Sequence, residues 1–248
     1  MRKCVWLMCA GLLFGLVGCG DDSGIGGSGG SGTGGSGGSG TGGSGGTGTM
    51  VMVSGIVVAA SIDGPEAPAE GVTVRVVGTS NSAMTDAQGA FSVMAPSGSA
   101  TFVTAADGNW GEQSTWNVPP AGRTDLGLAV IPDALVDAVA ASLGKTADLS
   151  KGIVSVSFDE DMAVGGETAS ISASSEFSFV FDATDAPVLG DTLIAGPGTE
   201  VNFVNTDVTS DVSATATNAA DQSCTLEFPD VTYSVQAKVL TEIDVTCP

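Results

Sequence analysis

The sequence lacks histidine altogether, and it has few basic and few aromatic residues. Its 248 residues include no histidine, seven lysines and arginines together, three tryptophans and one tyrosine. Without an imidazole, Ser-His-Asp and Cys-His nucleophilic sites and histidine-ligated zinc sites are excluded. A phosphoryl-transfer site holds its phosphate with several cations, and this chain has few to supply. We therefore expect a protein that is not an enzyme and uses no cofactor.

Acidic residues, in contrast, are abundant. Aspartate and glutamate together number 28, and the formal net charge is −21. A chain of this charge repels nucleic acid, so no nucleic-acid partner is expected. The simplest interpretation of the acids is a solvated surface. A hydrolase that works with paired carboxylates is an alternative. It would require two of these acids to share one concave pocket and to have raised pKa values.

The N-terminal residues have the pattern of an export signal. Arg2 and Lys3 precede an apolar run over residues 4–18, CVWLMCAGLLFGLVG. A helix needs roughly 20 apolar residues to cross a bilayer, so this run is too short to span one but suits a signal peptide. The run ends in LVG before Cys19, which resembles the lipobox of bacterial lipoproteins. An ordinary signal peptide followed by an incidental cysteine is the alternative.

The lipobox resemblance implies a processed and acylated protein. The signal peptide of residues 1–18 would be removed, and Cys19 would carry a diacylglycerol and an N-terminal acyl chain such as palmitate. Several chains are needed, because one acyl chain anchors a protein only marginally. The partner implied by this anchor is a membrane, and the implied location is the bacterial cell envelope. We expect the outer membrane, with the chain facing the periplasm or the exterior.

A low-complexity linker follows the cysteine. Seventeen of the thirty residues from 20 to 49 are glycine, and most of the others are serine or threonine. Such a segment cannot bury a core, and we expect a flexible coil with an r.m.s. reach of about 30 Å. Residues 19–49 are therefore predicted to be a disordered leash between the anchor and the folded part.

Residues 50–131 have the pattern of short β-strands separated by turns. In EGVTVRVVG, Val72, Val74 and Val76 alternate with polar residues, which is typical of a half-buried strand. The segment DAQG at 86–89 predicts a tight turn in which Gly89 adopts a positive φ. Strands at intervals of about ten residues without helices between them favour an antiparallel sandwich.

This region also resembles a known family. GIV at 55–57, APAEGVTV at 67–74, TDAQGAF at 85–91 and PSG at 96–98 follow one another in order. Their spacing is similar to that of carboxypeptidase regulatory-like domains, which are small transthyretin-like β-sandwiches. The resemblance implies a sandwich over residues 50–131 that has neither zinc ligands nor catalytic groups. It implies no peptidase activity.

The remaining sequence predicts a connecting helix and a second sandwich. In PDALVDAVAASL the apolar residues Leu135, Val136, Val139, Ala140 and Leu143 form one helical stripe. This predicts a helix within a connection over residues 132–150. From 151 to 248 the strand pattern returns, and Phe177, Phe179 and Phe181 alternate on one face. A weak repeat of GIV, at 55–57 and 152–154, favours a second module of similar design.

Cys224 and Cys247 are the thiols left in the processed chain. An even pair in an exported protein predicts a disulfide. Closing this loop should contribute about 3.5 kcal/mol to stability by the chain-entropy estimate. A redox or metal pair is the alternative, but the sequence offers no C-x-x-C spacing, third cysteine or histidine in its support.

Two further clusters are candidate binding sites. Asp159 and Asp161, with Glu160 between them, supply hard oxygen ligands that could bind Ca²⁺, although a solvated turn is the simpler interpretation. Trp110 and Trp116 lie among amides and an acid in NWGEQSTWN. On an extended strand both would share one face, where they could stack sugar rings. The alternative is that both rings fill the core.

These observations predict an all-β protein with two antiparallel β-sandwich modules joined by one short helix, after a disordered Gly/Ser linker. The predicted function is a non-enzymatic, lipid-anchored envelope protein that acts as an interaction, scaffold or adhesion-type module. Its expected partners are an envelope protein or a polysaccharide. The alternative is a surface carbohydrate-binding module that uses Trp110 and Trp116.

Overall fold

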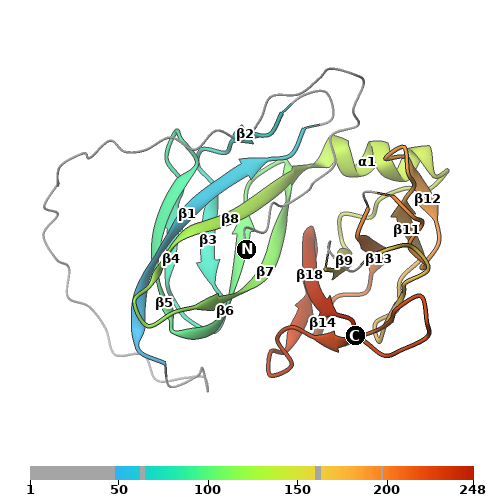
Figure 1. Cartoon of the computed structure of the whole chain (residues 1–248). Helices are drawn as coiled ribbons and strands as arrows, with labels where there is room; N and C mark the ends of the chain where they lie inside the picture. The colour runs from blue at the N-terminus through green and yellow to red at the C-terminus, as the bar shows by residue number, and fades with distance from the viewer. Residues whose placement is uncertain (1–47, 62–64, 160–162, 197) are drawn as a thin grey trace, which may run out of the picture.

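The computed structural model describes residues 48–61, 65–159, 163–196 and 198–248. Figure 1 shows two bodies of β-structure side by side, with a helix beyond the upper end of the first and beside the second. Cys19 and the segments 1–18 and 20–47 lie outside the described residues. The described part is mostly β-structure and contains one helix, α1 (Asp133–Ser142).

The first half forms a sheet that folds over its own core. Its strands are β1 (Met50–Ala59), β2 (Ala67–Pro68), β3 (Thr73–Val76), β4 (Ser82–Met84), β5 (Ala90–Pro96), β6 (Gly98–Ala105), β7 (Asn109–Val118) and β8 (Arg123–Pro132). Pairing runs β5-β1-β8-β7-β6-β3-β4. The alternating valines of β3 are buried, with Val74 and Val76 at 0% exposure. The period-two prediction for this strand is confirmed.

The predicted turn at 86–89 is also present. Gly89 has a φ of +71°, and its amide donates to the carbonyl of Asp86 over 2.9 Å. A Cβ at this glycine would lie 2.3 Å from the carbonyl oxygen of Val57, on the neighbouring strand β1. Only glycine combines this conformation with so close an approach.

The second half consists of one main sheet covered by two short ribbons. Its strands are β9 (Gly152–Phe158), β10 (Thr168–Ile171), β11 (Phe177–Phe181), β12 (Pro187–Leu189), β13 (Glu200–Thr206), β14 (Thr209–Val212), β15 (Ala214–Thr217), β16 (Thr225–Leu226), β17 (Tyr233–Val235) and β18 (Val239–Thr246). The main sheet runs β12-β11-β13-β9-β18, and β16 also pairs with β18. The ribbons are β10–β15 and β14–β17. Their apolar residues share one core with Val154, Val156 and Ile243 of the main sheet.

The two halves share a sheet, which the sequence did not predict. Strand β18 of the second half pairs in parallel with β7 of the first, with Leu240 opposite Glu112. Gln236 donates to the side chain of Gln113 over 2.9 Å, and Lys238 forms an ion pair with Asp133 at the start of α1. The predicted helix lies between the two halves in the chain, but it is not their sole connection. The connection includes a hydrogen-bonded strand pair.

The strand directions also correct the predicted fold class. In each half the first strand pairs in parallel with the last one, as β1 does with β8 and β9 does with β18. The sheets are thus mixed and do not form two purely antiparallel sandwiches. The strand periodicity that indicated β-structure carries no information on direction, because side chains alternate in the same way in parallel and antiparallel strands.

Helix α1 confirms the predicted helix. Val136 and Ala140 are buried, and Leu135, Val139 and Leu143 pack partly buried against the same cluster. Gly144, with a φ of +68°, follows the helix end. Within the described residues, no helix has both the length and the apolar character needed to cross a membrane.

Candidate functional site

A pocket between α1 and the main sheet of the second half is the candidate site, and we call it the α1 pocket. Its volume is about 240 Å³. It is lined by α1, by Ile131 at the end of β8, and by residues of β9, β11, β13 and β18. Figure 1 shows α1 across the upper end of the second half, above β11 and β12.

Strand register explains why the pocket wall is apolar near the helix. Residues paired in register point to the same face of a sheet. Leu240, Ile153, Val204 and Phe177 are paired in this way across β18, β9, β13 and β11. All four line the pocket, as do Phe179 and Phe181. The three phenylalanines therefore share one face, as their alternation predicted.

On β18, β9 and β13 the next two rows of this face are polar, whereas β11 continues the first of them with Phe179. Glu242, Ser155 and Asn202 stand in one row, and Asp244, Ser157 and Glu200 stand in the next. Of these, Asn202 and Glu200 line the α1 pocket. Asn202 is only 4% exposed, and its Nδ2 atom has no hydrogen-bond partner among the described residues. A buried amide without a partner is costly, and Asn202 is one of the residues that line the cavity.

Asp185 supplies a second polar atom to the pocket. It lies in the turn between β11 and β12, where the amide of Asp185 donates to the carbonyl of Asp182 over 3.0 Å. Its φ of +60° is unusual for a residue with a side chain. Its Oδ1 atom is buried and has no hydrogen-bond partner within the described chain. Two residues that line the pocket thus each carry a buried polar atom without a hydrogen-bond partner, one a donor and the other an acceptor.

Glu112 lies on β7, where the two halves pair. It is 4% exposed, and its Oε2 accepts a hydrogen bond from the amide of Ala129 over 2.5 Å. Burial raises the pKa of Glu112 well above its ordinary value, and the charges of Glu242, Glu200 and Asp244 raise it further. Glu112 does not line the α1 pocket. The raised pKa favours the protonated form of this carboxyl group.

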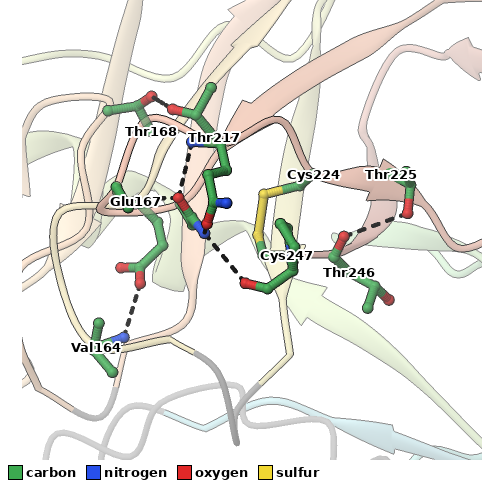
Figure 2. Close-up of a disulfide and its surroundings, with 12 residues drawn as sticks. Val164, Glu167, Thr168, Thr217, Cys224, Thr225, Thr246 and Cys247 are labelled. Carbon is green, nitrogen blue, oxygen red and sulfur yellow. Dashed lines mark hydrogen bonds between the residues drawn. A yellow bond between two sulfur atoms is a disulfide. The ribbon is translucent and has the colours of Figure 1, made fainter.

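The predicted disulfide is present. Cys224 and Cys247 are joined, and Figure 2 shows the bond between the segment that leads into β16 and the end of β18. Thr225 and Thr246, the residues next to these cysteines, are opposite each other in the β16–β18 pair. The prediction of a structural bridge between adjacent terminal segments is confirmed.

The two tryptophans are not a sugar-binding surface. Trp110 is 0% exposed and Trp116 is 5% exposed. Trp116 packs in the core of the first half, and Trp110 packs in the cluster between the halves. The guanidinium of Arg123 lies 4.5 Å from the ring centre of Trp116. Stacking of a sugar requires an exposed ring face, so the prediction that these tryptophans bind carbohydrate is wrong. Both rings fill the interior, which was the alternative interpretation of the sequence.

The remaining predicted site residues are only partly described. Asp159 follows β9, and its carbonyl accepts a hydrogen bond from the amide of Ala163 over 3.0 Å. Asp161 lies outside the described residues, so calcium binding by this pair stays a prediction. Within the described residues, no cluster of three or more acids or cysteines has the arrangement of a metal site. Cys19 likewise lies outside the described part, and its acylation stays a prediction.

The sequence did not reveal the α1 pocket. The alternation of Phe177, Phe179 and Phe181 was visible, and so was the helical stripe. Which face of the sheet the helix covers depends on the β7–β18 pairing, which has no local signal. Asn202 was likewise visible only as one polar residue in a strand.

Comparison with known proteins does not identify a family. No protein-family model matches the chain, and no curated protein matches it. The resemblance to carboxypeptidase regulatory-like domains therefore remains an interpretation of the sequence segments. Solved structures are similar only at low TM-scores.

For three of these structures, the match spans nearly the whole of the other chain. The shaft pilin spaA from Lactobacillus rhamnosus GG is 12% identical, with a TM-score of 0.26 over 80% of this chain and 98% of that one. The minor pilin GBS52 from Streptococcus agalactiae is 10% identical, with a TM-score of 0.22 over 79% and 95%. A DUF3823 family protein from Parabacteroides merdae is 17% identical, with a TM-score of 0.26 over 80% and 99%.

A fourth structure is much longer than this chain. The chain spans about a third, 34%, of the Bacillus anthracis TIE protein, at 8% identity and a TM-score of 0.28. All four are distant likenesses, and they assign neither a family nor an activity.

Proposed function

We propose that this chain is a non-enzymatic interaction module of the bacterial cell envelope, held at a membrane by acylated Cys19. The observation that carries the extracytoplasmic part is the Cys224–Cys247 disulfide, because such bonds persist outside the reducing cytoplasm. The apolar leader that ends at Cys19 and the glycine-rich linker support the anchor. The partner class is an envelope protein or a polysaccharide.

The paired β7 and β18 support a binding role. Because the two halves share a sheet, the α1 pocket stands on elements that are held in a fixed arrangement, which favours recognition. The absence of histidine from the sequence argues against nucleophilic catalysis. Two carboxylates, Asp185 and Glu200, line the pocket, and we propose that their charge serves the recognition of a ligand.

The anchor can be tested with one cysteine substitution and a matched control. The whole chain, with a C-terminal tag, is expressed in a bacterium that processes lipoproteins and is labelled with an alkyne analogue of palmitate. We expect the unaltered chain and a Cys9→Ala control to carry the label and to sediment with membranes. Cys19→Ala should lose both properties. Label retained on Cys19→Ala, or an unlabelled unaltered chain, would overturn the proposed anchor.

A further inference from the structure

We propose that the α1 pocket binds a short apolar peptide segment that carries a positive charge. The proposal rests on the interaction role proposed above and names the partner of that role. Four kinds of observation support it: the pocket's apolar wall, its size, its two unpartnered polar atoms and its charge.

The apolar wall provides the main contact area. Leu135 and Val139 of α1 face the phenylalanines of β11 across a space of about 240 Å³. Pockets for drug-sized ligands run from roughly 300 to 1,000 Å³. A smaller space suits one or two apolar side chains of a peptide better than a whole cofactor.

The unpartnered atoms fit a peptide bond. Asn202 Nδ2 is a buried donor without an acceptor, and Asp185 Oδ1 is a buried acceptor without a donor. Both residues line the pocket. A peptide main chain supplies both kinds of partner, because its carbonyl groups accept hydrogen bonds, as Asn202 Nδ2 requires, and its N–H groups donate them, as Asp185 Oδ1 requires. A fatty acyl chain or other pure hydrocarbon would leave both atoms unsatisfied.

The charge of the site selects the residue beside the apolar one. Glu200 and Asp185 line the pocket, and no lysine or arginine does. The chain as a whole has a formal net charge of −21. Complementary charge speeds association and discourages partners of like charge, so a lysine or arginine in the peptide is favoured and a glutamate is disfavoured.

Titration calorimetry with three defined probes tests this assignment on the full chain. The probes are N-acetyl-Lys-Leu-Phe-Val-amide, the same peptide with Glu in place of Lys, and sodium decanoate. We expect the lysine peptide to bind at least about tenfold more tightly than the other two, in line with the weight of a charge-assisted contact. No heat with the lysine peptide at millimolar concentration would overturn the proposal. Equal or tighter binding of decanoate would also overturn it, in favour of an acyl ligand.

Two tryptophan substitutions on α1 locate the binding. Ala138 is exposed and lines the pocket, whereas Ala141 is exposed on the same helix and does not line it. Ala138→Trp should fill the space and lower affinity for the lysine peptide at least about tenfold, while Ala141→Trp should leave it within about twofold. Equal affinities for the two variants would place the binding elsewhere and refute the site.

Asn202→Leu separates a recognition role from a structural one. The substitution removes the buried amide that has no partner, so the free protein should become more stable and melt at a higher temperature. The same change should weaken binding of the lysine peptide by about fivefold, through loss of one hydrogen bond. A lower melting temperature together with unchanged affinity would show that Asn202 serves the fold alone. These outcomes are independent of Cys19, so they can fail while the anchor holds.

Discussion

The two halves of the molecule reach a similar strand arrangement with different means of stabilisation. In both halves the first strand pairs in parallel with the last. The first half builds its core from strands of up to ten residues and needs no disulfide. The second covers its main sheet with ribbons of three or four residues per strand, and a disulfide lies at one end.

The residues of the ribbons explain this difference. Strands β10 and β15 contribute Ala169, Ala214 and Ala216 to the core, whereas the first half contributes valine, leucine, phenylalanine and tryptophan side chains. Alanine buries little apolar area, so short alanine-containing strands contribute less hydrophobic free energy than long valine-rich ones. A covalent link that restricts the unfolded chain can offset such a deficit. The bridge thus lies beside the ribbon that contributes alanines, where the amide of Cys224 donates to the carbonyl of Ala216 over 2.9 Å.

The largest expected effect comes from Ile243→Ala in β18. Ile243 is 0% exposed in the core of the second half, and truncation of such a residue costs about 4 kcal/mol. Because β18 also pairs with β7, the first half should lose structure in the same transition. Tryptophan fluorescence reports the first half through Trp110 and Trp116, and circular dichroism reports the whole chain. Urea curves from the two signals should coincide, and a first half that unfolds at its unaltered midpoint would show independent modules.

The next effect comes from removing the bridge. The double substitution Cys224→Ala with Cys247→Ala should lower the free energy of unfolding by about 3.5 kcal/mol. The second half should depend on this link because its short, alanine-containing strands bury little apolar area. Urea denaturation measures the loss, and the unaltered chain in dithiothreitol is the matched control, which should lose a similar amount. An unchanged midpoint in both cases would mean that the ribbons are stable without the bridge.

A smaller effect is expected at Glu167, a buried carboxylate of the second half. Glu167 is 1% exposed and accepts hydrogen bonds from the amides of Val164 and Gly165, over 2.9 and 2.8 Å. Figure 2 shows the bond to Val164 near the disulfide. Glu167→Gln offers one acceptor oxygen in place of two, which should cost about 2 kcal/mol. Thermal unfolding measures this against Asp230→Asn, an exposed position in the same half that should change nothing.

The sequence predicted what depends on local pattern. The buried valines of β3, the turn at Gly89, the apolar stripe of α1 and the Cys224–Cys247 bridge were all predicted, because each has a signature within a few residues. The shared sheet was not predicted. The pairing of β18 with β7 joins residues more than a hundred positions apart, and backbone hydrogen bonds leave no trace in side-chain alternation.

The tryptophans illustrate the same limit at the level of a site. Their even spacing predicted that both rings share one face of an extended strand, but the two rings pack in different clusters, and the burial of each depends on distant elements. Trp116 is covered by the folded sheet of the first half, and Trp110 by the cluster under α1. A binding surface and a core look alike in sequence when both need aromatic residues and alternation. The difference is whether another strand or helix covers the aromatic face, and this is known only from the folded chain.

The smallest expected effect comes from Glu112→Gln at the joint between the halves. This substitution should change how steeply the free energy of unfolding depends on pH. Burial and the neighbouring acids raise the pKa of Glu112 well above its ordinary value of 4.5. The folded state therefore holds a proton that the unfolded state releases, so the contribution of this group to stability is full below pH 4.5. That contribution is lost as the pH rises through the raised pKa.

Glutamine keeps an acceptor for the Ala129 amide and cannot ionise. Unfolding free energies measured between pH 4 and pH 9 should fall less steeply with rising pH in Glu112→Gln than in the unaltered chain. The exposed control Glu70→Gln should reproduce the unaltered curve. If the slopes of all three proteins agreed, Glu112 would be ionised in the fold, and the acids of β7, β13 and β18 would not act on it as their placement requires.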